Sequence, residues 1–198
     1  MLLRQTAAVL LAAGRSLRHP GQHKLCRDLD GRPLGLHAAA TIAALAPAVR
    51  IAVCSEPTRD LVAGLSALGF EIAWNDDPGR GLATSIAAGV RAARRHPVEA
   101  VLICLADMPF VGLRHMRALV DRLDPAGGTT AAGSRGAGSA RVGPPAAFAG
   151  ATIDRLLALD GDRGAAALLS QAAAVDAPPE ELADFDSPAD FEAYAASR

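Results

Sequence analysis

Short apolar runs alternate along the first part of the chain with longer segments in which apolar residues recur every three to four positions. The runs cover residues 8–13, 49–54, 70–74 and 98–105, and such runs are typical of strands buried on both faces. The longer segments cover residues 34–46, 55–68, 82–95 and 113–123 and predict helices. Because strands and helices alternate, we predict an α/β chain with a single doubly wound, mostly parallel sheet and helices on both faces.

The last third of the chain has a weaker pattern. Residues 124–143 are dominated by Gly, Ala, Ser and Thr, a composition that fits a flexible linker or a loop over an active site. Because structureless loops of about 20 residues are uncommon in compact domains, we expect a strand or two inside this segment. Beyond it we expect strands at 144–148 and 174–177 and helices at 150–159, 161–171 and 188–196. No internal repeat or second domain is evident, so residues 1–198 are predicted to form one domain.

Composition and charge narrow the classes of function. A net charge of −1 makes no general electrostatic case for binding nucleic acid or an anionic membrane, and no apolar run approaches the length of a membrane span. The cysteines at 26, 54 and 104 lack paired spacing, which is typical of proteins from a reducing compartment. The apolar residues near the start pass directly into Arg15 and Arg18, unlike a secretory signal peptide. We therefore expect a cytoplasmic protein.

A polar, cationic loop follows the first predicted strand at Gly14. It carries Arg15, Ser16, Arg18 and Lys24. Glycine lets backbone N–H groups approach a ligand, and Arg and Lys supply charge for phosphate oxygens. The spacing excludes a P-loop, which needs Gly-x4-Gly-Lys-Ser/Thr, and a dinucleotide fingerprint, which needs Gly-x-Gly-x-x-Gly. By itself the loop fits either a triphosphate site or the ordinary first strand-to-helix connection of an α/β protein.

Two carboxylates are candidate ligands for a metal ion. Asp107 lies at the end of a very apolar run and precedes Met-Pro. A carboxylate at the mouth of a buried strand needs a partner, which is either a hard cation or the start of the next helix. Mg²⁺ prefers one or two carboxylates together with phosphate oxygens and water. Asp186, in the acidic segment 184–190, can supply the second carboxylate, although Asp or Ser before Pro is also a routine helix start.

Six segments resemble motifs of the molybdenum cofactor cytidylyltransferase family, and together they span nearly the whole chain. The opening signature is Leu-Ala-Ala-Gly-x-Ser-x-Arg-(x)5-Lys, at residues 11–24. The others are Gly-Leu-Ala-Thr-Ser-Ile-x-x-Gly at 81–89, Leu-x-Asp-x-Pro at 105–109, Gly-x-Pro-(x)2-Phe at 143–148, Gly-Asp-x-Gly-Ala at 161–165 and the acidic segment 184–190. The chain departs from the family at His19-Pro20, where a hydrophobic-Gly pair is usual, and at Ala166, where a basic residue is usual. These departures leave open the path of the loop up to Lys24 and one contact with the acceptor.

The resemblance implies a Rossmann-like nucleotidyltransferase fold and a role for each matching residue. The implied catalytic residues are Lys24, Arg18 and Asp107, and the implied ligands of Mg²⁺, or of Mn²⁺ as its substitute, are Asp107 and Asp186. The implied nucleotide-binding residues are Leu11, Ala12, Ala13, Gly14, Arg15, Ser16, Lys24, Thr84, Ser85 and Gly89. The implied acceptor-binding residues are Gly143, Pro144, Asp162 and Arg163.

The resemblance also implies a reaction, the transfer of a cytidylyl group from CTP to the terminal phosphate of molybdenum cofactor with release of pyrophosphate. Family members that use guanine tend to carry Gly-Gly where this chain has Ala13-Gly14, which suggests a pyrimidine base. Ser85 and the backbone of Ala12 and Ala13 would contact that base. Residues 1–110 would then form the NTP-binding half and residues 111–198 the acceptor-binding half with the second metal ligand.

Several alternatives remain open at the level of the residues. The acceptor could be another phosphorylated small molecule, such as a sugar or alditol phosphate, and the donor could be GTP. A non-catalytic nucleotide- or cofactor-binding chaperone is a rival of a different class. The expected partners are CTP and molybdenum cofactor, with transient contact to a molybdoenzyme or its chaperone, and we expect neither nucleic acid nor a membrane as a partner.

Overall fold

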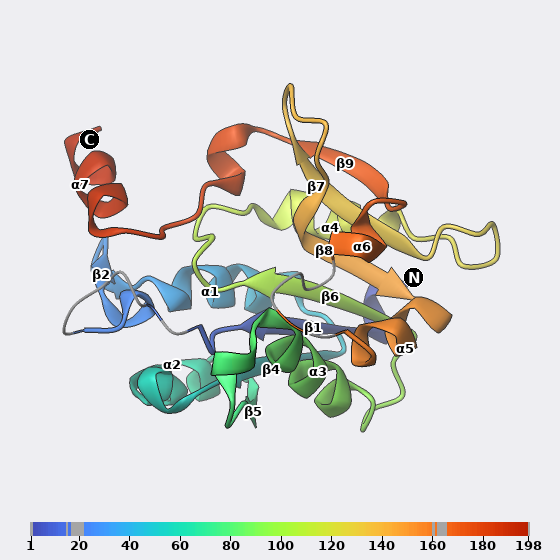
Figure 1. Cartoon of the computed structure of the whole chain (residues 1–198), viewed down its shortest axis with the longest axis horizontal. Helices are drawn as coiled ribbons and strands as arrows, with labels where there is room; N and C mark the ends of the chain where they lie inside the picture. The colour runs from blue at the N-terminus through green and yellow to red at the C-terminus, as the bar shows by residue number, and fades with distance from the viewer. Residues whose placement is uncertain (1, 15, 17–21, 160, 162–165, 198) are drawn as a thin grey trace.

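Seven strands form the central sheet of the computed structural model, which describes residues 2–14, 16, 22–159, 161 and 166–197 (Figure 1). Their order across the sheet is β5 (Glu71–Trp74), β4 (Val49–Cys54), β1 (Thr6–Leu11), β6 (Ala100–Leu105), β8 (Gly143–Ala149), β7 (Ala131–Gly136) and β9 (Ala173–Ala177). Neighbouring strands pair in parallel except at β8, which is antiparallel to both β6 and β7. The predicted α/β fold with a mostly parallel sheet is confirmed.

Different helices cover the two faces of the sheet, as predicted (Figure 1). Side chains alternate between the faces of a strand, so Leu10 packs in one apolar cluster and Val9 in the other. The Leu10 face is covered by α1 (Gly35–Leu45), α2 (Val62–Ala67) and α4 (Leu113–Asp121), while α7 (Pro188–Ala196) joins the same apolar cluster at its edge, away from the strands (Figure 1). The Val9 face is covered by α3 (Leu82–Ala93), α5 (Ala151–Leu157) and α6 (Ala166–Leu169). In the described part of the chain, no helix combines the length and apolar character needed to cross a membrane.

Short elements connect the main helices and strands. The 3₁₀ helices are η1 (Leu2–Gln5), η2 (Lys24–Cys26), η3 (Glu56–Leu61), η4 (Pro78–Arg80) and η5 (Pro179–Leu182). The helix predicted over residues 55–68 begins as η3 and becomes α-helical only in α2. The Thr58 hydroxyl bonds both the N–H and the carbonyl of Ser55, at 3.0 Å each, which holds the first turn in the tighter form. The strand expected inside residues 124–143 is present as β7.

The C-terminal helix is held against a small hairpin near the first loop. The hairpin pairs β2 (Asp28–Leu29) with β3 (Arg32–Pro33) through a two-residue turn. In α7, the Tyr194 hydroxyl donates to Asp30 Oδ2 at 2.7 Å, and the Arg27 guanidinium lies 4.2 Å from the centre of the Phe191 ring. These contacts bring the acidic segment 184–190 next to the carboxyl end of β1, so that Asp186 meets Lys24 although 162 positions separate the two in sequence.

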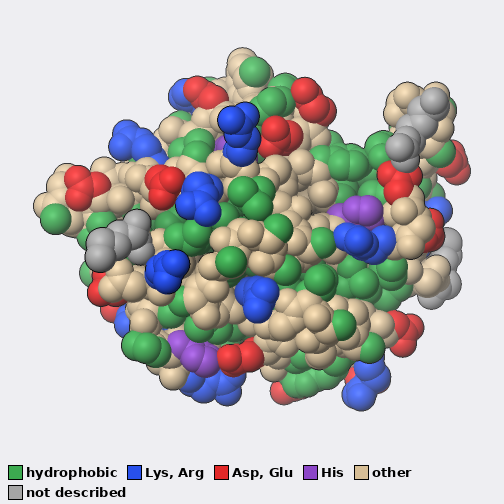
Figure 2. Space-filling model, turned by 180° about the vertical axis from the view of Figure 1, so that it is seen from behind, with side chains coloured by type: hydrophobic (Ala, Val, Ile, Leu, Met, Phe, Trp, Pro, Cys, Tyr) green, Lys and Arg blue, Asp and Glu red, His purple; other side chains and the backbone are tan. Residues whose placement is uncertain are grey.

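Charged side chains are interspersed on the face of the molecule shown in Figure 2, where basic and acidic groups alternate without a continuous field of either sign. This distribution agrees with the net charge of −1. The local groups at the carboxyl ends of the strands therefore matter more for chemistry than the overall field.

Gly89 is expected from the family resemblance to contact the nucleotide, but the structure places it in the core between α3 and the sheet. A Cβ atom built on Gly89 would lie 2.3 Å from Val9 Cγ1 and 3.0 Å from Val53 Cγ2. Real Cβ atoms do not approach so closely, so only glycine lets α3 rest on β1 and β4 at this distance. The structure therefore gives Gly89 a packing role.

Gly89→Ala is expected to lower the free energy of unfolding by about 1–3 kcal/mol, because the added methyl group overpacks the helix–sheet contact. Equilibrium denaturation in urea would measure the loss. Gly136→Ala is a suitable control, since its added Cβ would meet only Leu182 Cδ1 at an ordinary 3.9 Å. Equal stability of the two variants would contradict the packing role of Gly89.

Candidate active site

The candidate site lies where two central strands end side by side. β1 and β6 are parallel neighbours, with Leu11 opposite Leu105. Gly14 follows β1 and Asp107 follows β6, so both leave the same edge of the sheet. In parallel α/β sheets this edge, at the carboxyl ends of the strands, is where ligands bind.

Lys24, Asp107 and Asp186 form a compact ionic cluster at this edge. Lys24 Nζ donates to Asp107 Oδ2 at 2.8 Å and to Asp186 Oδ1 at 2.7 Å. The Lys24 side chain is 11% exposed, whereas those of Asp107 and Asp186 are 20% and 49% exposed. The tertiary structure thus joins three residues that the sequence analysis had selected from three distant segments.

The electrostatics of the cluster keep Lys24 charged. Burial lowers the pKa of its ammonium group, but the charges and hydrogen bonds of Asp107 and Asp186 outweigh burial and raise the pKa above its usual value. The pKa of the nearby Asp184 carboxyl is raised, first by burial and then by repulsion from Asp186 and Asp107. Lys24 is also the only lysine in the sequence, although basic residues are frequent. A compact ammonium group fits between two carboxylates where a guanidinium fork would need more room.

The donor set at this cluster fits a hard divalent cation. Asp107 Oδ1 is buried and has no hydrogen-bond partner among the described residues, which is unfavourable unless a cation or ligand binds it. Asp186 supplies a second carboxylate that reaches the same ammonium group. Within the described ranges, no group of three or more His, Cys, Asp or Glu side chains gathers as a metal site. Two carboxylates, completed by phosphate oxygens and water, are the arrangement that Mg²⁺ or Mn²⁺ uses with nucleotides.

The two ends of the cationic loop are pinned to each other. His23 accepts from the Leu25 N–H through Nδ1 at 3.2 Å, so its Nε2 carries the proton that is donated to the Gly14 carbonyl at 2.7 Å. Ser16 Oγ accepts from the Lys24 N–H at 2.9 Å. These bonds hold Gly14 and Ser16 beside Lys24. Two groups of predicted site residues lie outside the described residues, namely Arg15 and Arg18 in this loop and Asp162 and Arg163 near α6.

A pocket beside the cluster gathers half of the ten predicted nucleotide-binding residues. It is lined by Leu11, Ala13, Gly14, Lys24, Leu25, Pro78, Gly81, Leu82, Ser85, Leu105 and Asp107. Two predicted residues make other bonds: the Ala12 N–H donates to the Val53 carbonyl of β4, and the Thr84 hydroxyl donates to the Gly81 carbonyl. By contrast, no acceptor for the Ala13 N–H occurs among the described residues. Ala13 and Ser85 are therefore the predicted base contacts that the pocket retains.

Asn75 is a buried polar residue of this region that the sequence analysis did not select. It follows β5, and its side-chain amide donates to both Thr84 Oγ1 and Ser85 Oγ at 2.9 Å. The signal that could have found it is its position, because a polar residue directly after a predicted strand lies at the same sheet edge as Gly14 and Asp107.

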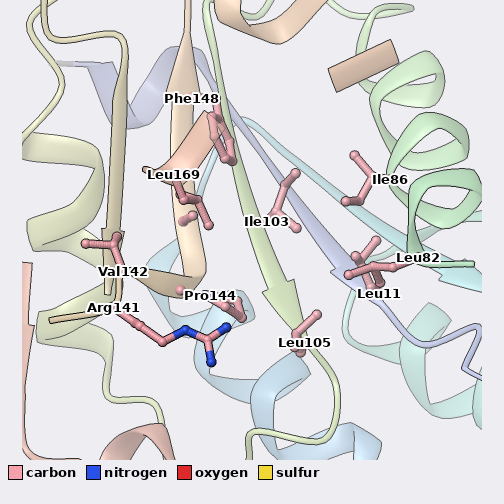
Figure 3. A pocket seen from close by; sticks show the side chains of 12 residues that line it. Leu11, Leu82, Ile86, Ile103, Leu105, Arg141, Val142, Pro144, Phe148 and Leu169 are labelled. Carbon is pink, nitrogen blue, oxygen red and sulfur yellow. The ribbon is translucent and has the colours of Figure 1, made fainter. Parts of the chain in front are cut away.

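A second, mostly apolar pocket adjoins the first (Figure 3). Its lining comes from β1, β6, β8, α3, α6 and the segment before β8, and comprises Leu11, Leu82, Ile86, Ile103, Leu105, Arg141, Val142, Gly143, Pro144, Ala146, Phe148 and Leu169. Leu11, Leu82 and Leu105 line both pockets. Gly143 and Pro144, two of the predicted acceptor-binding residues, lie here. Among the described lining residues only Arg141 is charged, and Figure 3 shows its guanidinium reaching toward Leu105.

Comparison with known sequences places these features in a family. The family described as "MobA-like NTP transferase domain" matches residues 8–176. The purine catabolism protein PucB of Bacillus subtilis is 30% identical in an alignment 204 positions long, which covers 93% of this chain and 93% of PucB. The bifunctional protein GlmU of Sphingopyxis alaskensis is 36% identical over 118 residues, which cover 59% of this chain. The chain spans about a quarter of the length of GlmU, since the match covers 26% of that protein.

Solved structures show the same fold. A nucleotidyl transferase from Methanothermobacter thermautotroptrophicus, Mth528, superposes with a TM-score of 0.81 at 22% identity over 98% of this chain and 97% of its own. Rv0371c of Mycobacterium tuberculosis, in complex with manganese, gives 0.71 at 22% identity, covering 98% of this chain and 100% of its own. Molybdopterin-guanine dinucleotide biosynthesis protein A from Archaeoglobus fulgidus gives 0.70 at 18% identity, covering 97% and 100%.

Proposed function

Because the chain belongs to the MobA-like NTP transferase family and is a nucleotidyltransferase, we propose that it transfers a cytidylyl group from CTP to the terminal phosphate of a molybdopterin-type cofactor. A phosphate oxygen of the acceptor forms the new bond to the α-phosphorus of CTP. The bond from that phosphorus to the oxygen bridging to the β-phosphate breaks, and pyrophosphate leaves with the electron pair. The protein supplies no nucleophile in this reaction, so its contribution is alignment and stabilisation of charge.

The observation that carries the proposal is the ionic cluster of Lys24, Asp107 and Asp186 at the sheet edge. A protonated lysine in a half-enclosed site stabilises the negative charge on a phosphoryl group during transfer. Asp107 and Asp186 would hold Mg²⁺ or Mn²⁺, which neutralises charge on phosphate oxygens when bound. Gly14 and Ser16, pinned beside Lys24, provide a backbone against which the phosphates can be placed.

The two adjoining pockets support the choice of donor and acceptor. Ala13 and Ser85 line the pocket beside the cluster, where the base of CTP would sit. The apolar pocket with Arg141 suits an acceptor that combines a flat ring system with anionic groups, as a pterin phosphate does. Among proteins of the same fold, the one from Archaeoglobus fulgidus is named for molybdopterin-guanine dinucleotide biosynthesis, which agrees with a pterin acceptor. Contact with a molybdoenzyme or its chaperone stays a prediction.

A pyrophosphate-release assay with each of the four nucleoside triphosphates tests the proposal. We expect release only when CTP, Mg²⁺ and molybdenum-bound molybdopterin are all present. Release with GTP in place of CTP would contradict the choice of donor. Release with CTP and a sugar or alditol phosphate, but not with molybdopterin, would contradict the choice of acceptor. Binding of CTP without release with any acceptor would instead indicate a nucleotide-binding chaperone.

Gly14→Ala is expected to weaken CTP binding about tenfold or more while leaving the free energy of unfolding nearly unchanged. A Cβ on Gly14 meets no atom within 4 Å, so the methyl group is tolerated by the protein itself. Gly14 lines the nucleotide pocket, so the same methyl group occupies space that the triphosphate needs. Isothermal titration with CTP and Mg²⁺ measures the loss, and unchanged affinity would place the phosphates elsewhere.

A further inference from the structure

The side-chain amide of Asn75 has a defined orientation. Its Oδ1 accepts from the Asp77 N–H at 3.1 Å, while its Nδ2 donates to Thr84 Oγ1 and Ser85 Oγ at 2.9 Å each. Exchanging the oxygen and nitrogen would turn a donor toward the Asp77 N–H, so the amide is held one way round. Asn75 is only 6% exposed, which keeps water from substituting for these bonds.

This orientation determines what the Ser85 hydroxyl can offer. Ser85 Oγ accepts from Asn75 through one of its two lone pairs, so its own proton cannot point at Asn75 and is available to donate in another direction. No acceptor for that proton occurs in the described part of the chain, and Ser85 is buried at the wall of the nucleotide pocket. The neighbouring Thr84 differs, since two protein carbonyls can accept its one proton, that of Gly81 at 2.9 Å and that of Asp77 at 3.2 Å. Ser85 is therefore set as a hydrogen-bond donor toward the pocket.

We propose that Asn75 is a specificity-determining residue for the nucleobase, because it makes Ser85 a donor toward the base. The Ala13 N–H lines the same pocket and also lacks an acceptor among the described residues. Two donors select a base edge with two adjacent acceptors, which cytosine has in O2 and N3. Uracil and guanine carry N–H groups at N3 and N1, where a second donor is unfavourable. This inference rests on the proposed function only in that a nucleoside triphosphate binds in this pocket.

Asn75→Asp reverses the direction of the hydrogen bond between residue 75 and Ser85 without changing the size of the side chain at position 75. A carboxylate at position 75 still accepts from the Asp77 N–H but also accepts from Ser85, whose lone pairs then face the base. We expect the ratio of the CTP and UTP dissociation constants to shift by about tenfold or more toward UTP. Isothermal titration of each triphosphate with Mg²⁺ into the whole protein measures the ratio without any acceptor.

Two further variants separate hydrogen-bond polarity from charge and from folding. In Asn75→Asp/Asp77→Asn the net charge is that of the wild type, and we expect the same shift toward UTP. Asp77→Asn alone keeps the backbone N–H that Asn75 uses, so it is expected to retain the wild-type ratio. Asn75→Ala, which lets the Ser85 hydroxyl turn either way, is expected to bring the ratio toward one and serves if the Asp variants fail to fold.

The outcomes distinguish this inference from the proposed function. Selective CTP binding by the wild type together with an unchanged ratio in the Asn75 variants would overturn the role of Asn75 while leaving the proposed function intact. Preference of the wild type for UTP or GTP would overturn the assignment of Ser85 as a donor. Failure of the wild type to bind any triphosphate would overturn both.

Discussion

Lys24→Met is expected to lower kcat by about 10²–10³, the loss typical when a preorganised charged donor to the transition state is removed. Methionine keeps most of the length of the side chain but removes the ammonium group that lies 2.8 Å from Asp107 and 2.7 Å from Asp186. The phosphoryl group being transferred then loses its buried cationic partner. The rate of pyrophosphate release at saturating CTP and acceptor measures the effect.

A second readout of Lys24→Met separates its catalytic role from simple loss of structure. The ammonium group and a divalent cation compete for the same two carboxylates, so the variant is expected to bind Mn²⁺ more tightly than the wild type in the absence of nucleotide. Lys24→Arg is the charge-matched control and should recover only part of the rate, because its planar fork cannot replace a compact point charge. A kcat within a few-fold of the wild type in Lys24→Met, with the fold intact by circular dichroism, would refute the mechanism.

Asp107→Asn is expected to reduce kcat by about a hundredfold or more at low Mg²⁺, since the neutral amide is a poor ligand for a hard cation. The substitution conserves shape and removes the carboxylate whose Oδ1 is buried without a hydrogen-bond partner among the described residues. Raising the Mg²⁺ concentration should restore part of the activity. A titration of activity against Mg²⁺ and against Mn²⁺ measures the shift.

Thermal unfolding supplies an independent test of the metal site. Mn²⁺ should raise the Tm of the wild type, because a ligand that binds only the folded state stabilises it, and should raise that of Asp107→Asn much less. Asp176→Asn is the matched control, since this carboxylate pairs with Arg135 at the far edge of the sheet and lies outside the site. An equal rise in Tm for Asp107→Asn and the control would place the metal elsewhere.

The strands of the sheet and the helices that cover it could be predicted from the sequence, because each depends on a local pattern of apolar and polar residues. Strands buried on both faces appear as continuous apolar runs, so the strand predicted at 49–54 matches β4 and that at 98–105 contains β6. The boundaries were less accurate where side chains compete with the backbone, as at Thr58, whose hydroxyl keeps the first turn of the predicted helix in the 3₁₀ form. Gly89 shows another limit of prediction from sequence. A glycine that close packing requires cannot be distinguished in the sequence from a glycine that lets the backbone approach a ligand.

The sequence by itself determined the sheet and one edge of the site. Gly14 and Asp107 each follow an apolar run, and parallel strands leave a sheet at the same edge, so local pattern alone places them together. The tertiary structure decided the rest. Asp186 reaches Lys24 because contacts between distant segments hold its part of the chain at the sheet edge: the Phe185 N–H donates to the Asp107 carbonyl at 3.0 Å, and Phe191 and Tyr194 of α7 contact Arg27 and Asp30. The direction in which the Ser85 hydroxyl can donate is set by Asn75, which lies ten residues earlier in the sequence, directly after β5. These contacts depend on long-range packing and on the direction of single hydrogen bonds. Neither can be predicted from the spacing of residues along the chain.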